Sequence, residues 1–353
     1  MSDSSQNENL ISCRDYKIDY KIEGGEKMVD VKEIKTIELV PFTLMTSSIA
    51  AIIGIIYAII LLITFGALSA FIPGAALIFA SLGISMIILY PIGAFLIYTT
   101  LSFITALIYN MLVPRLGGIK LGLEGEQVTS LPVVSFALIL AGVGAIWAFI
   151  MGLLLTAVIL PLTTIISTII PLASQLAVAT INNVTSILSM SNATGNLTVN
   201  ATNLTAANLP NGSAVGTAGV VIALMLIIGL PIAVFVLGFI GSALSAIFYN
   251  FIIPRVGGVR LILAPAGTAH EITSIPVVAA SLAIASVALI FGIIIGIIQF
   301  ISIAAAGNAV MGIEILIYDV LRYFIGTFIM VAIITIIYNF LATRIGGVQL
   351  GLE

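Results

Sequence analysis

Long apolar runs alternate with short polar segments along most of the chain. Six runs reach or exceed the roughly 20 residues that a helix needs to cross about 30 Å of hydrocarbon. They cover residues 46–65, 84–113, 133–160, 220–253, 277–303 and 323–341. The pattern therefore predicts six membrane-spanning helices.

A period of two follows the second, fourth and sixth runs, and this period marks short strands with one apolar face. The apolar positions are Ile119, Leu121 and Leu123, then Val259, Leu261 and Leu263, and finally Val348, Leu350 and Leu352. We expect each of these strands to start close to the end of a helix.

One signature joins helix to strand at all three places: YNMLVPRLGGIKL from Tyr109, YNFIIPRVGGVRL from Tyr249 and YNFLATRIGGVQL from Tyr338. A second pattern precedes each pair of runs: IKTIELV from Ile34, VTSLPVV from Val128 and ITSIPVV from Ile272. Such recurrence does not arise by chance, and it predicts one unit of strand, span, connection, span and strand used three times. The units cover residues 28–124, 125–265 and 266–353, and each supplies one helix hairpin.

The closing strand of one unit leads directly into the opening strand of the next. Short connections rich in Gly and Pro favour antiparallel hairpins. In a pseudo-threefold arrangement the last strand (347–353) lies beside the first (31–39) and completes a third hairpin. We therefore expect three β-hairpins, or a closed six-stranded barrel without open strand edges, beneath the six helices.

Composition supports a polytopic α-helical membrane protein, because 61% of the residues are hydrophobic and 8% are charged, against about 25% charged in soluble domains. A net charge of −3 offers no basic surface for nucleic acid. One cysteine, Cys13, excludes a disulfide framework and a cysteine-based metal site.

Charge predicts the orientation, because loops rich in Lys and Arg stay in the cytoplasm. Nearly all basic residues lie on the strand side, which places both termini in the cytoplasm of a cell-membrane protein. Asn-x-Ser/Thr sequons gather in the opposite loop (181–216), at Asn183, Asn192, Asn196, Asn200, Asn203 and Asn211. We expect a glycosylated, disordered external tract; the alternative is a polar linker in which sequons occur by accident.

The three external connections contain more apolar sequence than a turn needs, as in residues 66–83. They predict short interfacial or packed helices between the spans, with re-entrant loops lining a path as the alternative. Residues 1–27 are polar and have no copy in the other units, which predicts a disordered tail or a true start at Met28.

The signature residues are expected to be structural. They are Tyr109, Asn110, Arg115, Gly117, Gly118, Tyr249, Asn250, Arg255, Gly257, Gly258, Tyr338, Asn339, Arg344, Gly346 and Gly347. The tyrosines suit headgroup anchoring, and the asparagines suit interhelical bonds near an axis or caps of their own helix ends, with a polar ring around a pathway as the alternative. The arginines suit helix carboxyl ends and anionic headgroups. The glycine pairs suit a helix-stop turn better than a phosphate cradle.

Other polar residues give weaker signals. Asp319 and Arg322 are spaced to pair on one helix face, with Glu314 nearby, and such a cluster is an interfacial salt bridge or marks an ion route. His270 beside Glu271 indicates a solvated histidine in a hairpin turn. We find no nucleophile with a base, no metal-ligand cluster and no paired carboxylates, so the sequence predicts neither an enzyme nor a cofactor.

Each unit resembles the small two-helix membrane domain of unknown function found in actinobacterial proteins. The resemblance rests on the Tyr-Asn and Gly-Gly pattern and on the strand leading into the first span, and it covers residues 29–353. It implies three fused copies, a self-contained pseudo-trimer, and it supplies no activity.

Two functions remain open on the sequence. The first is a non-catalytic scaffold or assembly protein of the cell envelope, surrounded by lipid, with membrane or cytoplasmic protein partners. The alternative is a channel or transporter with a pathway along the pseudo-threefold axis. Small residues dominate the spans and polar residues are sparse within them, which favours close helix packing and the scaffold.

Overall fold

The computed structural model describes residues 30–69, 71–72, 76–190 and 212–353. Within these residues the helices are α1 (Leu39–Ser69), α2 (Ala76–Leu116), α3 (Val133–Met190), α4 (Gly212–Leu224), α5 (Leu230–Val256), α6 (Val277–Ala305) and α7 (Ala309–Ile345), and a π-helical turn, η3 (Met225–Gly229), joins α4 to α5. Six helical segments of this part of the chain are long and apolar enough to cross a membrane. The six predicted spans thus correspond to six helices of sufficient length and apolar character.

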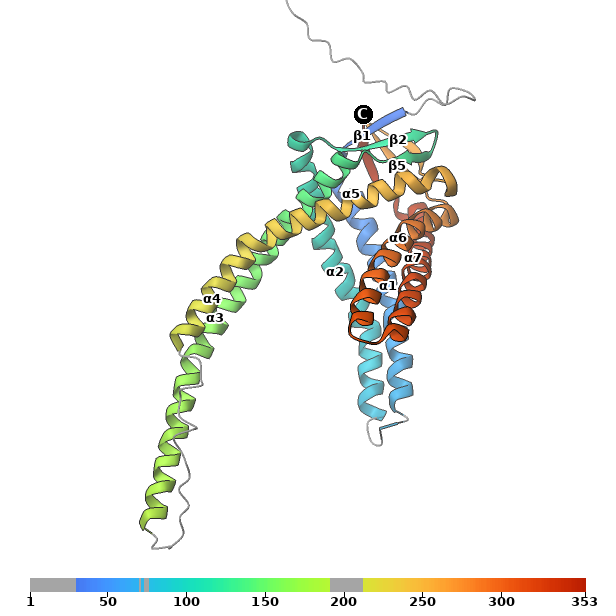
Figure 1. Cartoon of the computed structure of the whole chain (residues 1–353). Coiled ribbons are helices and arrows are strands. Elements are labelled where there is room, and N and C mark those ends of the chain that lie inside the picture. The colour runs from blue at the N-terminus through green and yellow to red at the C-terminus, as the bar shows by residue number, and fades with distance from the viewer. Residues whose placement is uncertain (1–29, 70, 73–75, 191–211) are drawn as a thin grey trace, which may run out of the picture.

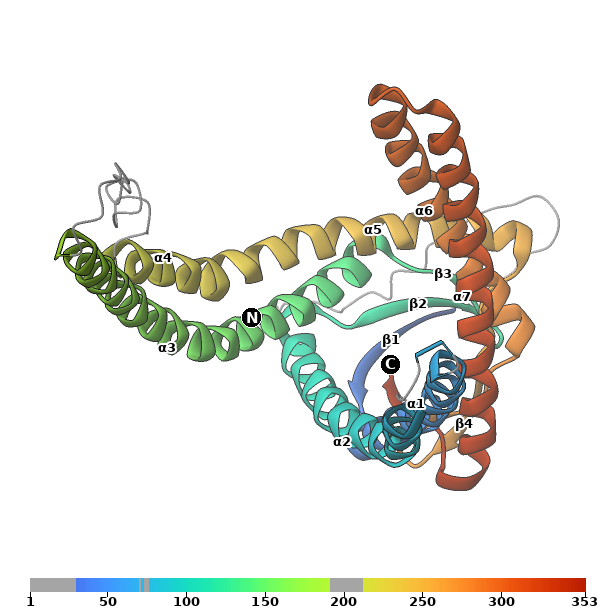
Figure 2. The same ribbon diagram turned by 90° about the horizontal axis from the view of Figure 1, so that it is seen from below.

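The helices form three antiparallel pairs, here called arm 1 (α1 with α2), arm 2 (α3 with α4 and α5) and arm 3 (α6 with α7). All three arms leave the same end of the molecule and diverge, and arm 2 curves away from the other two (Figure 1). Seen along the molecule, the arms point in different directions (Figure 2). Large apolar side chains cover their surfaces, as at Ile63, Val158 and Leu237, which are 66%, 65% and 69% exposed.

Close helix approach within each arm depends on small residues. A Cβ atom added at Gly54 would lie 3.1 Å from the Tyr90 carbonyl oxygen, and one at Gly152 only 2.1 Å from the Leu226 carbonyl oxygen. Leu226 lies in η3, so the π-helical turn and Gly152 meet directly. Close helix packing through small residues, as predicted, is thus found between the helices of one arm.

The external connections differ from the prediction of separate short helices. The spans continue instead: α1 extends to Ser69, α3 to Met190 and α6 to Ala305. The apolar segments contain few helix breakers, and prolines such as Pro161 and Pro171 remain inside α3, as is tolerated in membrane helices. Residues 181–190 of the predicted disordered tract are therefore helical, and residues 191–211 lie outside the described residues, as do residues 1–29.

The strands are β1 (Asp30–Ile37), β2 (Ile119–Glu124), β3 (Gln127–Ser130), β4 (Ile262–Ala266), β5 (Ala269–Ser274) and β6 (Gln349–Leu352). They form one antiparallel sheet in the order β3-β2-β1-β6-β5-β4. The predicted hairpins β2–β3 and β4–β5 are present, with Gly125 and Gly267 at positive φ in their turns. Strands β1 and β6 pair through Ile34 with Leu352 and Ile37 with Leu350, which confirms the predicted pairing of the first and last strands.

The two outer strands of this order also meet. Gln127 in β3 forms an antiparallel bridge with Arg260, just before β4. The Val128 N–H donates to the Val259 carbonyl (2.9 Å), and the Leu261 N–H donates to the Glu126 carbonyl (2.8 Å). These contacts link the two outer edges of the six-stranded sheet, which is here called the barrel.

The core lies where the barrel meets the arms. It comprises three apolar clusters, and each joins two arms. Met45 of α1 packs with Tyr338 of α7, Tyr249 of α5 with Ala283 of α6, and Tyr109 of α2 with Ile139 of α3. Each cluster contains one tyrosine of the repeated signature, so the barrel end is where the three arms are fixed to one another.

Candidate functional site

The repeated signature forms a joint between helix and strand, and its first glycine makes the turn. Gly117, Gly257 and Gly346 have φ of 80°, 89° and 82°, a conformation that side chains with a Cβ rarely adopt. The prediction of a helix-stop turn at positive φ is confirmed at all three.

The second glycine of each pair allows the chain to pass over the opening strand. A Cβ atom at Gly118 would lie 2.1 Å from the Ile34 carbonyl oxygen, one at Gly258 2.1 Å from that of Val128, and one at Gly347 2.0 Å from that of Ile272. No side chain fits at such distances. The glycine pair therefore combines two separate requirements, a turn and a close backbone approach.

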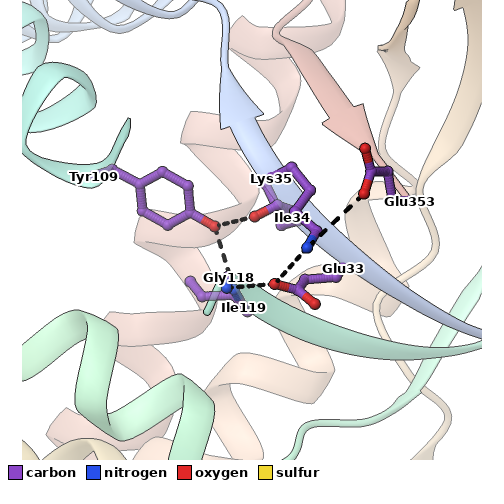
Figure 3. Close-up of polar contacts among 7 residues, drawn as sticks. All are labelled: Glu33, Ile34, Lys35, Tyr109, Gly118, Ile119 and Glu353. Carbon is purple, nitrogen blue, oxygen red and sulfur yellow. Dashed lines mark hydrogen bonds and ion pairs between the residues drawn. The ribbon is translucent and has the colours of Figure 1, made fainter. Parts of the chain in front are cut away.

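The tyrosines bind these same carbonyl groups, and Figure 3 shows this arrangement for Tyr109. Tyr109 Oη donates to the Ile34 carbonyl (2.7 Å) and accepts from the Ile119 N–H (3.3 Å). Tyr249 does the same with Val128 and Val259, and Tyr338 with Ile272 and Val348.

The prediction that these tyrosines are headgroup anchors is wrong, because they are only 4%, 7% and 6% exposed. Each ring is buried in the core clusters, and each hydroxyl bridges the strand that opens a unit and the strand that closes it.

Through both ends of the amide, each asparagine binds the backbone of one residue at the end of the opening strand or directly after it. Asn110 Nδ2 donates to the Ile37 carbonyl and its Oδ1 accepts from the Ile37 N–H, both at 2.9 Å. Asn250 makes the same two bonds with Leu131, and Asn339 with Ile275. The prediction that the asparagines meet near an axis or cap their own helix ends is therefore wrong. Their amides instead satisfy backbone groups between strand and helix that would otherwise lack partners.

Carboxylates complete the first and third joints. The Gly118 N–H donates to Glu33 Oε1 (2.6 Å), and the Gly347 N–H donates to Glu271 Oε1 (2.5 Å). At these two joints the glycine pair thus binds a carboxylate of the chain itself. The weaker alternative from the sequence was a bound phosphate. At the second joint the corresponding residue is Gln127, whose side chain lies against Gly257 and Gly258.

Sequence reasoning missed these acidic residues. The available signal was their position, since Glu33, Gln127 and Glu271 each stand directly before the repeated sequence pattern of the opening strand. Burial raises the pKa of the Glu33 carboxyl, but the Gly118 N–H and the Lys35 ammonium, 3.4 Å away, outweigh this effect. The pKa of Glu33 therefore lies below its ordinary value.

The signature arginines occupy the last helical turns. Arg115, Arg255 and Arg344 are exposed there. Arg255 lies over the Phe251 ring at 4.3 Å and donates to the Phe251 carbonyl (3.4 Å), and Arg344 lies 5.4 Å from the Phe340 ring centroid. Their places agree with the prediction of cations at helix carboxyl ends.

The remaining predicted residues lie apart from the joints. His270 is in strand β5, not in the hairpin turn, and its Nδ1 is buried without a hydrogen-bond partner. Asp319 and Arg322 form the predicted pair on α7 at 3.3 Å, and Glu314 is exposed. Asn183 lies in α3, and the other sequon asparagines (Asn192, Asn196, Asn200, Asn203 and Asn211) lie outside the described residues.

Comparisons with protein families, with curated proteins and with solved structures gave no match. Within the described part of the chain, no three His, Cys, Asp or Glu side chains are grouped so that they could hold a metal ion. The repeated tyrosines and asparagines bind the protein's own backbone.

Proposed function

We propose that the protein is a non-catalytic integral membrane scaffold of the cell envelope, which presents its β-barrel to protein partners. In this proposal three fused copies of a two-helix unit are arranged about a pseudo-threefold axis, and they correspond to the actinobacterial domain that each unit resembles. The barrel and both termini face the cytoplasm, and the predicted sequons are glycosylated.

The use of the signature residues is the observation that carries this proposal. Every Tyr, Asn and second Gly of the signature contacts the backbone of the strand that opens its own unit, or of the residue directly after that strand. Chemical groups that recur three times are thus engaged in fixing a barrel to three helix ends. A rigid platform is the property that such an arrangement supplies.

The character of the arms supports a scaffold over a conducting path. Their buried positions are largely small and apolar, as at Ala58, Ala106, Ala141 and Ala285, and such residues suit close helix packing. Charges near the barrel support the orientation, since Arg115, Arg255 and Arg344 follow the spans directly and positive residues stay on the cytoplasmic side. Deglycosylation of protein from the native host, followed by intact mass measurement, tests the glycosylation.

Flux measurement tests the scaffold against the alternative of a channel or transporter. The full chain is reconstituted into liposomes loaded with ions or a fluorescent solute, beside protein-free liposomes. A scaffold is expected to leave the flux unchanged. Sizeable, selective flux would overturn the proposal and support a pathway along the axis.

Site-specific crosslinking tests the partner surface in the native host. A photoreactive residue at exposed barrel positions, Lys120 or Glu126, is compared with one at Ile63, which is exposed on arm 1. Crosslinks to one defined protein from the barrel positions and not from Ile63 are expected. Equal labelling at all positions, or none from the barrel, would contradict the proposal.

A further inference from the structure

Arm 3 contains a polar cluster far from the barrel. Asp319 of α7 is only 3% exposed, and its Oδ2 accepts a hydrogen bond from Gln299 Nε2 of α6 at 2.9 Å. Its Oδ1 lies 3.3 Å from Arg322 Nη2. The two helices are close here, since a Cβ atom at Gly292 would lie 3.2 Å from the Asp319 carbonyl oxygen. The carboxylate is thus held between the helices and fixes one edge of the guanidinium.

The rest of the guanidinium is accessible. The Arg322 side chain is 53% exposed, and a guanidinium has five N–H donors in a planar fork. Its central carbon lies 5.0 Å from the Tyr323 ring centroid and 5.7 Å from that of Tyr318. Two aromatic rings therefore flank a cation that retains free donors.

The place of Arg322 along α7 matches a membrane interface. Arg322 and Arg344 are 22 positions apart, which corresponds to about 33 Å of helix. Residues 323–343 between them contain no Asp, Glu, Lys or Arg, and the hydrocarbon layer is about 30 Å thick. With Arg344 at the barrel-side boundary, Arg322 reaches the opposite boundary, where tyrosines are also enriched.

We propose that Arg322, flanked by Tyr318 and Tyr323, binds the phosphate of a phospholipid headgroup in the leaflet opposite the barrel. A guanidinium fork suits the two-oxygen geometry of a phosphate, and the rings pack beside the glycerol region. Asp319 and Gln299 act as positioning residues, because they hold the fork at the surface of the arm without facing the lipid. The site is separate from the joints and from the barrel surface proposed to meet partners.

Native mass spectrometry of the delipidated full chain in detergent tests this site. The probes are phosphatidylglycerol, phosphatidylcholine and a diacyl glycolipid without phosphate. The wild type is compared with the double variant Asp319→Asn/Arg322→Gln, which removes both charges of the pair together and so leaves neither without its partner. Glu314→Gln is the matched control, because it removes a charge from the same helix outside the cluster.

Both phospholipids are expected to form a first adduct that falls at least fivefold in the double variant and is unchanged in Glu314→Gln. The glycolipid is expected to bind all three proteins equally weakly. Unchanged phospholipid adducts in a double variant with wild-type thermal stability would overturn the proposal. So would glycolipid binding as strong as that of phosphatidylglycerol, or stabilisation by inorganic phosphate with no lipid preference, which would indicate a soluble anion instead.

Discussion

Polar side chains around the barrel bind backbone groups that are far away in the sequence, whereas those in the arms mostly bind their own helix. Tyr249 donates to Val128, 121 positions away, but Thr99 and Ser286 donate to carbonyls only four positions earlier. Side chains that bond within their own helix do not fix its position relative to neighbouring helices. The few long-range bonds at the barrel end therefore decide how the three arms are placed.

Removal of residues 348–353 should have the largest effect on this barrel end. Strand β6 bonds to β1 and β5, and each backbone hydrogen bond contributes about 1 kcal/mol net, so we expect a destabilisation of about 4 kcal/mol or more. Size-exclusion chromatography in detergent should show aggregated protein and a lower apparent unfolding temperature. An unchanged temperature would mean that closure of the barrel does not stabilise the fold.

Gly118→Ala should come next, because the added methyl group would overlap the Ile34 carbonyl. We expect a loss of about 3 kcal/mol, the upper range for overpacking, seen as a lower unfolding temperature.

Gly241→Ala in α5 is the matched control for this variant, since nothing lies within 4 Å of the added atom. There the change should stabilise by up to about 1 kcal/mol, because Ala is the better helix former. Equal effects at both glycines would remove the contrast between barrel end and arms.

A smaller effect is expected at the hydrogen bond between two arms. Trp147 Nε1 of α3 donates to Thr105 Oγ1 of α2 at 2.9 Å. Thr105→Val removes the acceptor and should cost about 1 kcal/mol. Trp147 is the only tryptophan, so its fluorescence reports this contact directly, and an emission spectrum identical to that of the wild type would show that the bond does not order the indole.

The smallest effect should be a pH dependence of the first joint. The pKa of Glu33 is lower in the folded protein than its ordinary value, so the carboxylate stabilises the fold above about pH 4.3, the unfolded value, and loses this effect as the pH falls through its folded pKa. Glu33→Gln should be less stable than the wild type at neutral pH, by less than about 1 kcal/mol because the carboxylate is partly exposed.

The difference should disappear on acidification, in unfolding curves measured between pH 3 and pH 7. Gln127→Glu offers the converse, since a carboxylate beside Gly258 should give the second joint an acid sensitivity that it lacks. A constant difference between Glu33→Gln and the wild type at every pH would contradict an electrostatic role for Glu33.

The sequence predicted the six long apolar helices, the hairpins and the pairing of β6 with β1, because periodicity and repetition report directly on elements and their order. It did not predict what the signature side chains bind. The partners of Tyr109 and Asn110 are backbone groups of Ile34 and Ile37. Because nearly every residue has the same backbone groups, the residue type does not reveal which of them are bound. The length of α3 was not predicted, because an apolar segment with prolines fits one long helix as well as two helices separated by a break.

Pairing of β1 with β6 has a consequence for biosynthesis. The ribosome makes β1 before any arm and β6 after all of them, so all six spans emerge before the barrel can close. A chain that is truncated before residue 349 would still possess all six of the long apolar helices described above. Its β1 and β5 would each keep an open edge on the barrel side, and open strand edges are the feature by which unfinished proteins attract other chains. The sheet can therefore take its final form only after β6 has been synthesised.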